Sequence, residues 1–304
     1  MSEAFIVEAV RTPVGRRGGG LSQIHPADMG GHVIQALMER SKLDPEAVED
    51  VVFGCLDQIG PQAGDIARTC ALLGGLPEHV PGVTVDRQCG SSQQAVSFAA
   101  QAVMSGTMDV VVAGGVQNMS QVPITAAFTA GQADDYNPYT SASRWQTLYG
   151  SGEVSQFVGA EMMADKWDIS REEMEEFAVE SHRRALRAQA EGRFDNEIVP
   201  IDGATRDEGP REPDLDKIRS LPTLTPDGRI TAAARLNDVP GIPATSRTFA
   251  SGAPVWANPP GAATGTTAPA GPPGMPRARP PCPPNGRGAA WASATNPFAS
   301  SILT

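Results

Sequence analysis

The first 115 residues alternate between short apolar runs and longer segments with helical periodicity. Apolar runs typical of strands cover 4–10, 48–56, 83–85 and 108–113, and helical patterns lie between them at 26–41, 65–73 and 91–104. The run 108–113 is continuously apolar, as expected of a parallel strand with both faces covered. Because strands that alternate with helices pair in parallel, this order predicts an α/β fold with a mostly parallel sheet.

The middle of the chain shows a different pattern. Residues 122–155 have no clear period and are expected to form a loop. The segment 170–191 is the clearest helix of this part, because Ser170 and Glu173 form a capping box at its start. On this helix we expect Phe177 on the apolar face and His182 on the exposed face, which favours a surface histidine over a general base.

A cysteine lies between a short strand and a helix in the segment 85–95. Cys89 is followed by Gly90, Ser91 and Ser92. A helix N-terminus presents unpaired backbone N–H groups and the positive end of the helix dipole. Both favour a thiolate, which is the nucleophilic form of cysteine. The alternative is a buried structural cysteine, but the small neighbouring residues leave room for a thioester and favour a nucleophile.

Several motifs in order resemble the thiolase family. They are Glu-Ala-Val-Arg-Thr-Pro at 8–13, Gln-Ala-Gly-Asp at 62–65, Gln-Cys-Gly-Ser-Ser at 88–92, Ala-Gly-Gly at 113–115, Gly-Arg-Phe at 192–194 and Asp-Glu-Gly-Pro-Arg at 207–211. The likeness covers about residues 4–233. It implies a first α/β half over residues 1–120 and a loop domain over residues 121–235.

The resemblance implies a two-step acyl transfer, as in an acetyl-CoA acetyltransferase or 3-ketoacyl-CoA thiolase of fatty acid and lipid metabolism. The Cys89 thiolate attacks an acyl-CoA thioester, and CoA or an acetyl-CoA carbanion then accepts the acyl group. The Cys89 N–H is one candidate oxyanion donor. The resemblance also places Arg211 in contact with coenzyme A, against the alternative of a loop arginine paired with Glu208 or Glu212. No cofactor or metal is expected.

The features of the family's second half do not follow in this sequence. The resemblance assigns acid–base steps to a Gly-His-Pro histidine and a second cysteine in a Gly-rich turn. None of the four histidines, His25, His32, His79 and His182, has that context. Cys282 lies between prolines. We therefore expect this chain to be inactive in turnover, or to be a non-catalytic fragment that binds CoA or pairs with a complete subunit.

Residues 236–304 differ in composition from the rest of the chain. They contain 14 of the 27 prolines, and the last acidic residue of the chain is Asp238. Such a composition is typical of disorder, and it predicts an irregular tail without helices or paired strands. The tail is either a natural flexible segment or the product of a reading-frame shift near residue 234, which the abundance of Pro, Ala, Gly, Arg and Trp favours.

Charge and cysteine spacing exclude several partners. A formal net charge of −11 argues against nucleic acid, which requires a basic face. Cys55, Cys70, Cys89 and Cys282 have neither disulfide-framework nor zinc-ligand spacing. With no long apolar run and no signal-peptide pattern, we expect a cytoplasmic protein without membrane contact. By resemblance, its partners are acyl-CoA and CoA, and the family's full fold would form a homodimer or homotetramer.

Overall fold

The computed structural model describes residues 3–131, 136–152, 154–233 and 252–257 of the 304-residue chain. The first unit of the chain extends from Met1 to Ala262. All described residues belong to the first unit.

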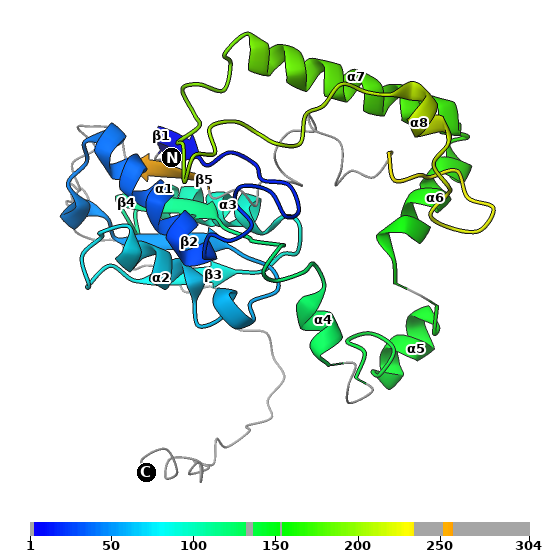
Figure 1. The fold of residues 1–304 in the computed structure, drawn as a ribbon. Helices are drawn as coiled ribbons and strands as arrows, with labels where there is room; N and C mark the ends of the chain where they lie inside the picture. The colour runs from blue at the N-terminus through cyan, green and yellow to red at the C-terminus, as the bar shows by residue number, and fades with distance from the viewer. Residues whose placement is uncertain (1–2, 132–135, 153, 234–251, 258–304) are drawn as a thin grey trace, which may run out of the picture. The chain divides into compact units, whose positions relative to one another are not determined.

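A five-stranded sheet organises the first unit (Figure 1). Its strands are β1 (Phe5–Arg11), β2 (Asp50–Gly54), β3 (Gly82–Val85), β4 (Val110–Gly115) and β5 (Gly252–Ala257), in the order β1-β5-β4-β2-β3. Strand β2 is parallel to β3 and β4, whereas β5 is antiparallel to β1 and β4. The expectation of an α/β fold with a mostly parallel sheet is confirmed.

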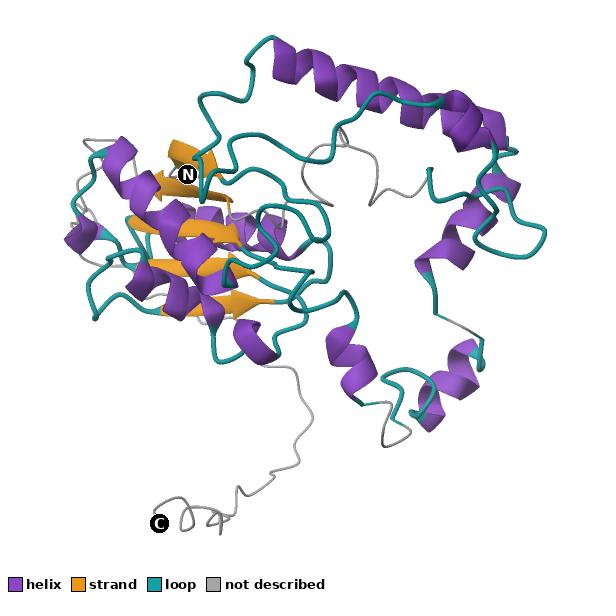
Figure 2. Ribbon diagram, viewed as in Figure 1, coloured by secondary structure: helices purple, strands orange, loops and turns teal. Residues whose placement is uncertain are grey.

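Two apolar cores lie on opposite faces of the sheet, because neighbouring residues of a strand point to opposite sides. Val51 and Phe53 of β2 belong to the larger core, together with residues of α1 (Pro26–Ser41) and α2 (Ile66–Leu73). Val52 belongs to the smaller core with Ala95, Ala99 and Val103 of α3 (Ser91–Ser105). The sheet therefore lies between α1 and α2 on one face and α3 on the other (Figure 2).

The middle of the chain is more helical than its sequence pattern indicates. The segment expected as a loop contains α4 (Ala126–Ala130) and α5 (Ser143–Tyr149), and α6 (Gln156–Lys166) and α8 (Leu215–Arg219) were not expected either. Helix α7 (Arg171–Ala190) has the expected capping box between Ser170 and Glu173. The short helices have no long apolar period, so their sequence pattern does not predict them. Aromatic contacts, such as that between the rings of Trp145 and Tyr149 at 4.7 Å, stabilise this segment.

The buried face of α7 differs from the expected one. His182 is 5% exposed, and Phe177, placed on the apolar face by its sequence period, is 61% exposed. Arg171 explains part of the difference, since its guanidinium donates to Glu175 at 2.7 Å and to the carbonyl oxygens of Arg219 and Leu221. These hydrogen bonds to Arg219 and Leu221 orient the first turns of α7. Apolar periodicity in the sequence does not reveal such polar contacts.

One segment of the expected irregular tail forms a strand in the sheet. Residues 252–257 pair as β5 with β1 from Phe5 to Arg11 and with β4 from Val110 to Gly115. The composition predicted no paired strand here, and that expectation is wrong for these six residues. Backbone pairing explains the difference, because the facing edges of β1 and β4 both offer N–H and C=O groups that any extended segment between them satisfies. The remainder of 236–304 lies outside the described residues.

Candidate active site

Cys89 lies in a tight turn between β3 and α3 that three polar contacts define. The Asp86 carboxylate accepts from the Gln88 backbone N–H at 2.7 Å. The Ser91 hydroxyl accepts from the Arg87 N–H at 2.9 Å and donates to the Gln88 carbonyl at 2.6 Å. These bonds hold Gln88 at a φ of 48°, a left-handed conformation that is uncommon for a residue with a side chain. The turn therefore presents Cys89 at the surface in a fixed backbone conformation.

Two glycines allow the start of α3 to lie directly on the sheet. Gly54 and Gly115 face each other at the carboxyl ends of β2 and β4. A Cβ atom at Gly54 would lie 2.2 Å from the Ser92 nitrogen, and one at Gly115 would lie 2.0 Å from the Ser92 hydroxyl oxygen. A side chain at Gly54 would meet backbone and displace the helix, and one at Gly115 would force the Ser92 side chain out of its place. Close packing of α3 on the sheet therefore depends on both glycines.

The start of α3 also leaves backbone donors near the cysteine. Gly90 is the N-cap residue and contributes no side-chain cap. The first bond of the helix runs from the Gln94 N–H to the Gly90 carbonyl at 2.9 Å. The N–H groups of Ser92 and Gln93 consequently occupy the positions at which a helix has donors without helical partners.

The three cysteines in the described part of the chain differ sharply in exposure. Cys89 is exposed, whereas Cys55 and Cys70 are buried. Burial raises the pKa of the Cys55 thiol to about 12, and the carboxylates of Asp86 and Asp57 act in the same direction. Burial likewise raises the pKa of Cys70. Cys89 is thus the accessible thiol of this set. Cys282 lies outside the described residues.

A buried amide network anchors the loops that follow β2 and β4. The backbone N–H of Asn118 donates to the Gln62 side-chain oxygen at 2.8 Å, and the Asn118 Nδ2 donates to the carbonyls of Leu21 and Ile24. Gln62 in turn donates to the Asp57 carbonyl at 3.1 Å. The network fixes the ends of the strands that carry Gly54 and Gly115. These amides were not expected from the sequence, since their partners are far away in the chain.

The four histidines of the chain all lie among the described residues. His25 caps α1 by accepting from the Ala27 N–H at 3.2 Å, and His32 contacts the Pro200 carbonyl at 2.9 Å. His79 is exposed and lies 3.8 Å from Glu46. His182 is buried in α7, which corrects its expected surface position. No hydrogen bond within the described segments joins any of them to Cys89.

Arg211 is exposed and lies in the segment between Glu208 and α8. No hydrogen bond or ion pair among the described residues joins it to Cys89, Glu208 or Glu212. Glu208 has other partners, because it accepts from the backbone N–H groups of Arg16 at 2.9 Å and Gly20 at 3.0 Å. The alternative pairing of Arg211 with Glu208 is therefore not formed between these described residues, and its contact with coenzyme A stays a prediction.

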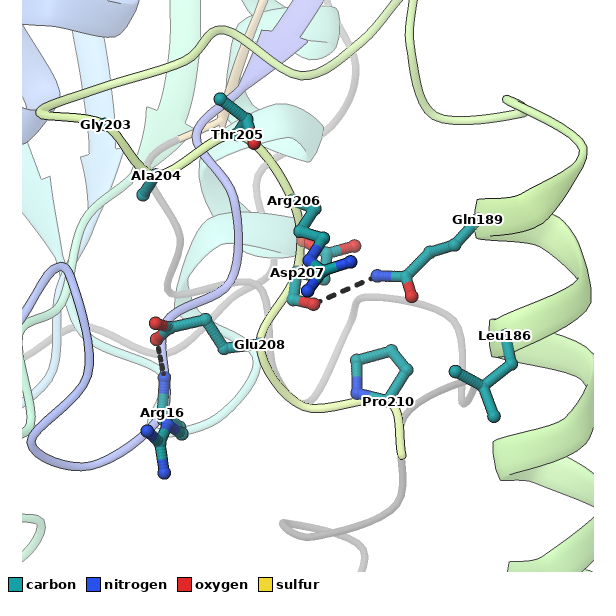
Figure 3. A pocket seen from close by; sticks show the side chains of 10 residues that line it. All are labelled: Arg16, Leu186, Gln189, Gly203, Ala204, Thr205, Arg206, Asp207, Glu208 and Pro210. Atoms are coloured by element: carbon teal, nitrogen blue, oxygen red, sulfur yellow. Dashed lines mark hydrogen bonds between the residues drawn. The ribbon is translucent and has the colours of Figure 1, made fainter. Parts of the chain in front are cut away.

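A pocket of about 490 Å³ lies next to this segment (Figure 3). Its lining includes Arg16 from the loop after β1, Leu186 and Gln189 from α7, and the loop from Gly203 to Pro210. Asp207 holds this loop in place, because its carboxylate accepts from the Arg11 guanidinium at 2.6 and 3.0 Å and from the Val14 N–H at 2.7 Å. The sequence motif at 207–211 resembles the family's, but it does not by itself indicate a pocket.

Within the described ranges, no group of three or more His, Cys, Asp or Glu side chains is arranged to hold a metal ion. None of the helices described is both long enough and apolar enough to cross a membrane.

The comparison with protein families agrees with this fold. The family model for the thiolase N-terminal domain matches residues 4–239. The chain belongs to the thiolase family. The matched range also agrees with the span expected from the sequence motifs, and β5 lies beyond it.

Several curated relatives are similar to the chain over its first part. It is 54% identical over 238 residues to steroid 3-ketoacyl-CoA thiolase FadA6 of Mycobacterium tuberculosis, covering 77% of this chain and 58% of the relative. It is 39% identical over 209 residues to 3-ketoacyl-CoA thiolase of Pseudoalteromonas translucida, and this match covers 68% of this chain and 51% of the relative. It is 36% identical over 262 residues to beta-ketoadipyl-CoA thiolase of Acinetobacter baylyi, and this match covers 78% of this chain and 64% of the relative. The chain thus spans between half and two thirds of each relative.

We expect iodoacetamide to alkylate Cys89 much faster than Cys55 or Cys70 between about pH 7 and 9. The raised pKa of Cys55 keeps that thiol protonated throughout this range, and burial blocks access to both thiols. Peptide mapping after brief treatment measures the three rates in one sample. Labelling of Cys55 or Cys70 ahead of Cys89 in folded protein would contradict the assignment of the nucleophile.

Proposed function

We propose that this chain carries out the nucleophilic half of a thiolase-type acyl transfer. The Cys89 thiolate attacks the carbonyl carbon of an acyl-CoA thioester and forms a new carbon–sulfur bond. The bond between that carbon and the CoA sulfur breaks, and CoA leaves as a thiolate that takes a proton from water. The observation that carries the proposal is the exposed Cys89 on a strained turn at the start of α3.

The surroundings of Cys89 support the first step of this reaction. The turn is fixed by Asp86 and Ser91, so that little conformational entropy is lost when the thioester approaches. The Cys89 N–H and the donors at the start of α3 are candidates to stabilise the oxyanion. The glycines beneath the helix keep this arrangement rigid against the sheet.

The names of the relatives support a substrate class. The similarity to a steroid 3-ketoacyl-CoA thiolase, at 54% identity, favours an acyl-CoA whose acyl group is bulky or contains rings. The other two relatives are named for 3-ketoacyl-CoA without a steroid and for beta-ketoadipyl-CoA, and both are less similar. We therefore favour an acyl group that is bulky or contains rings.

The second half of the reaction is expected to be very slow in this 304-residue chain. Deprotonating an acceptor requires an acid–base group, which typically contributes about 10²- to 10⁴-fold to the rate. None of the chain's histidines is hydrogen-bonded to Cys89 within the described residues. This favours a second candidate function, in which the chain binds CoA or pairs with a complete thiolase subunit without turnover, as a member of a family-like homodimer or homotetramer.

The experiment that separates these functions is an exchange assay. Formation of the acyl-enzyme is reversible, so isotopically labelled CoA should enter unlabelled acyl-CoA when both are incubated with the chain. We expect measurable exchange that the Cys89→Ala variant abolishes and that Cys55→Ala retains, with negligible steady-state thiolysis of acetoacetyl-CoA. Absence of exchange in folded protein would support the non-catalytic function, and rapid thiolysis would refute the half-reaction.

A further inference from the structure

Asp57 joins the loop after β2 to the first residues of α4. Its carboxylate accepts from the backbone N–H of Thr125 at 2.9 Å and from that of Ala127 at 2.8 Å, with a different oxygen atom for each. The residue is only 6% exposed. Asp57 therefore fixes the end of residues 116–125, which connect β4 to α4 and are called the β4–α4 segment below.

The backbone on both sides of this contact has an uncommon conformation. The φ angle is 52° at Asp57 and 70° at Thr125. A left-handed conformation is unfavourable for a β-branched residue such as threonine, and it persists only where surrounding contacts impose it. The hydrogen bond from the Thr125 N–H to Asp57 is such a contact. Because backbone strain is concentrated at ligand sites, the strained turn at Thr125 points to a role beyond linking two elements.

The β4–α4 segment begins at the edge of the sheet that also carries Cys89. At the end of β2, the Cys55 N–H donates to the Val85 carbonyl at 3.1 Å, and the Gly54 carbonyl accepts from the Val116 N–H at 3.1 Å. The ends of β3 and β4 thus flank the end of β2, and β3 leads directly into the Cys89 turn. Ligands of open α/β sheets bind at the carboxyl ends of the strands. The Cys89 turn and the β4–α4 segment therefore border the same region.

Apolar side chains of the β4–α4 segment face solvent. Val122 is buried and anchors the segment, whereas Met119 and Ile124 are exposed. No charged residue occurs between 116 and 125. An apolar group that covers Met119 and Ile124 removes their surface from water, which stabilises the complex.

We propose that the β4–α4 segment forms a wall for the acyl group of the thioester, and that Asp57 is the positioning residue that sets the preference for bulky acyl groups. The inference rests on the proposed function, because the acyl group is the part of the substrate that Cys89 receives. A bulky acyl group is expected to cover Met119 and Ile124, and an acetyl group is too short to do so. Asp57 acts only by holding the segment in place.

Alkylation of Cys89 by maleimides of two sizes tests the wall without requiring acyl transfer. N-cyclohexylmaleimide and N-methylmaleimide share one reactive group, so the ratio of their rates at Cys89, compared with that for free cysteine, measures the contribution of apolar contacts. We expect the full chain to favour the cyclohexyl reagent. D57N should lower this preference about two- to tenfold, because asparagine has one acceptor oxygen in place of two. The rate with N-methylmaleimide should stay the same.

D44N is the matched control for D57N. Asp44 also accepts from a backbone N–H at the start of a short helix, that of Glu46 at 3.0 Å, but it precedes β2 whereas Asp57 follows it. D44N should leave the preference at the wild-type value. Equal preferences in D57N and D44N, a wild-type ratio equal to that of free cysteine, or an equal fall in both maleimide rates in D57N would overturn the inference.

The variant T125G separates positioning of the segment from a general loss of stability. Glycine adopts the left-handed conformation without strain, so the turn at residue 125 depends less on Asp57 when glycine is present. D57N should therefore lower the preference less in T125G than in the wild-type chain. Effects of the two substitutions that simply add would show that they act independently, which contradicts a clamp between Asp57 and Thr125.

Acetyl-CoA and cyclohexanecarbonyl-CoA separate this inference from the proposed function. Faster acylation of Cys89 by the bulky thioester, with a preference that D57N lowers, would support both. A maleimide preference that depends on Asp57, together with no acylation by either thioester, would support the wall and refute the acyl transfer. Acylation by both thioesters without a size preference in either assay would overturn the wall and leave the proposed function in place.

Discussion

A chain that ends at Ser251 should lose cooperative unfolding, whereas one that ends at Ala262 should unfold like the full chain. The shorter chain lacks β5, which is the strand between β1 and β4. In the described sheet β1 pairs only with β5, so removing β5 separates β1 from the sheet. The longer chain retains the whole first compact unit.

The expected loss is large relative to the stability of a domain. Each lost backbone hydrogen bond contributes about 0.5–1.5 kcal/mol net, and β5 pairs along both of its edges. The sum is several kcal/mol, compared with a total of about 5–15 kcal/mol for a typical domain. Thermal unfolding followed by circular dichroism measures the difference. Identical transitions for the chains ending at Ser251 and Ala262 would show that β5 does not belong to the folded sheet.

The substitution Gly54→Ala should displace α3 and the Cys89 turn. Its Cβ would lie 2.2 Å from the Ser92 backbone nitrogen and 2.3 Å from the Ser91 carbonyl carbon. Because both are backbone atoms, no side-chain rotation relieves the clash, and overpacking of this kind costs about 1–3 kcal/mol or more. We expect a lower melting temperature and slower alkylation of Cys89 relative to folded wild type.

Gly159→Ala is the matched control for that substitution. A Cβ at Gly159 meets no atom within 4 Å, and the residue lies inside α6. Alanine is favoured over glycine within a helix by about 1 kcal/mol, so this variant should be as stable as wild type or slightly more stable. A Gly54→Ala protein that matches the Gly159→Ala protein in both measurements would show that α3 does not lie directly on the sheet.

Local signals in the sequence were sufficient for much of the sheet and its first helices. Helix α1 begins at Pro26 and ends at Ser41, as its pattern indicates, because a proline at the first turn and an apolar face mark it locally. The position of Cys89 between a strand and a glycine-serine helix start was likewise predictable. The family match over residues 4–239 confirms the resemblance that these motifs indicated.

The features that sequence reasoning missed depend on contacts between distant residues. Helix α7 is oriented in part by polar bonds to Arg219 and Leu221, and β5 forms because β1 and β4 leave a position between them. The pocket exists because Asp207 binds Arg11 and Glu208 binds the loop at 16–20. The residues of each pair are far apart in the sequence. No local sequence pattern indicates which residues will contact each other.

The most direct test of the proposed function is to locate the acyl group after the chain has been incubated with acyl-CoA. Peptide mapping by mass spectrometry should find one acyl adduct on the peptide that contains Cys89, and hydroxylamine should remove it because it is a thioester. Cys55 and Cys70, both buried, should remain unmodified. An adduct on either of those cysteines, or no adduct on Cys89 in folded protein, would contradict the proposal that Cys89 is the nucleophile.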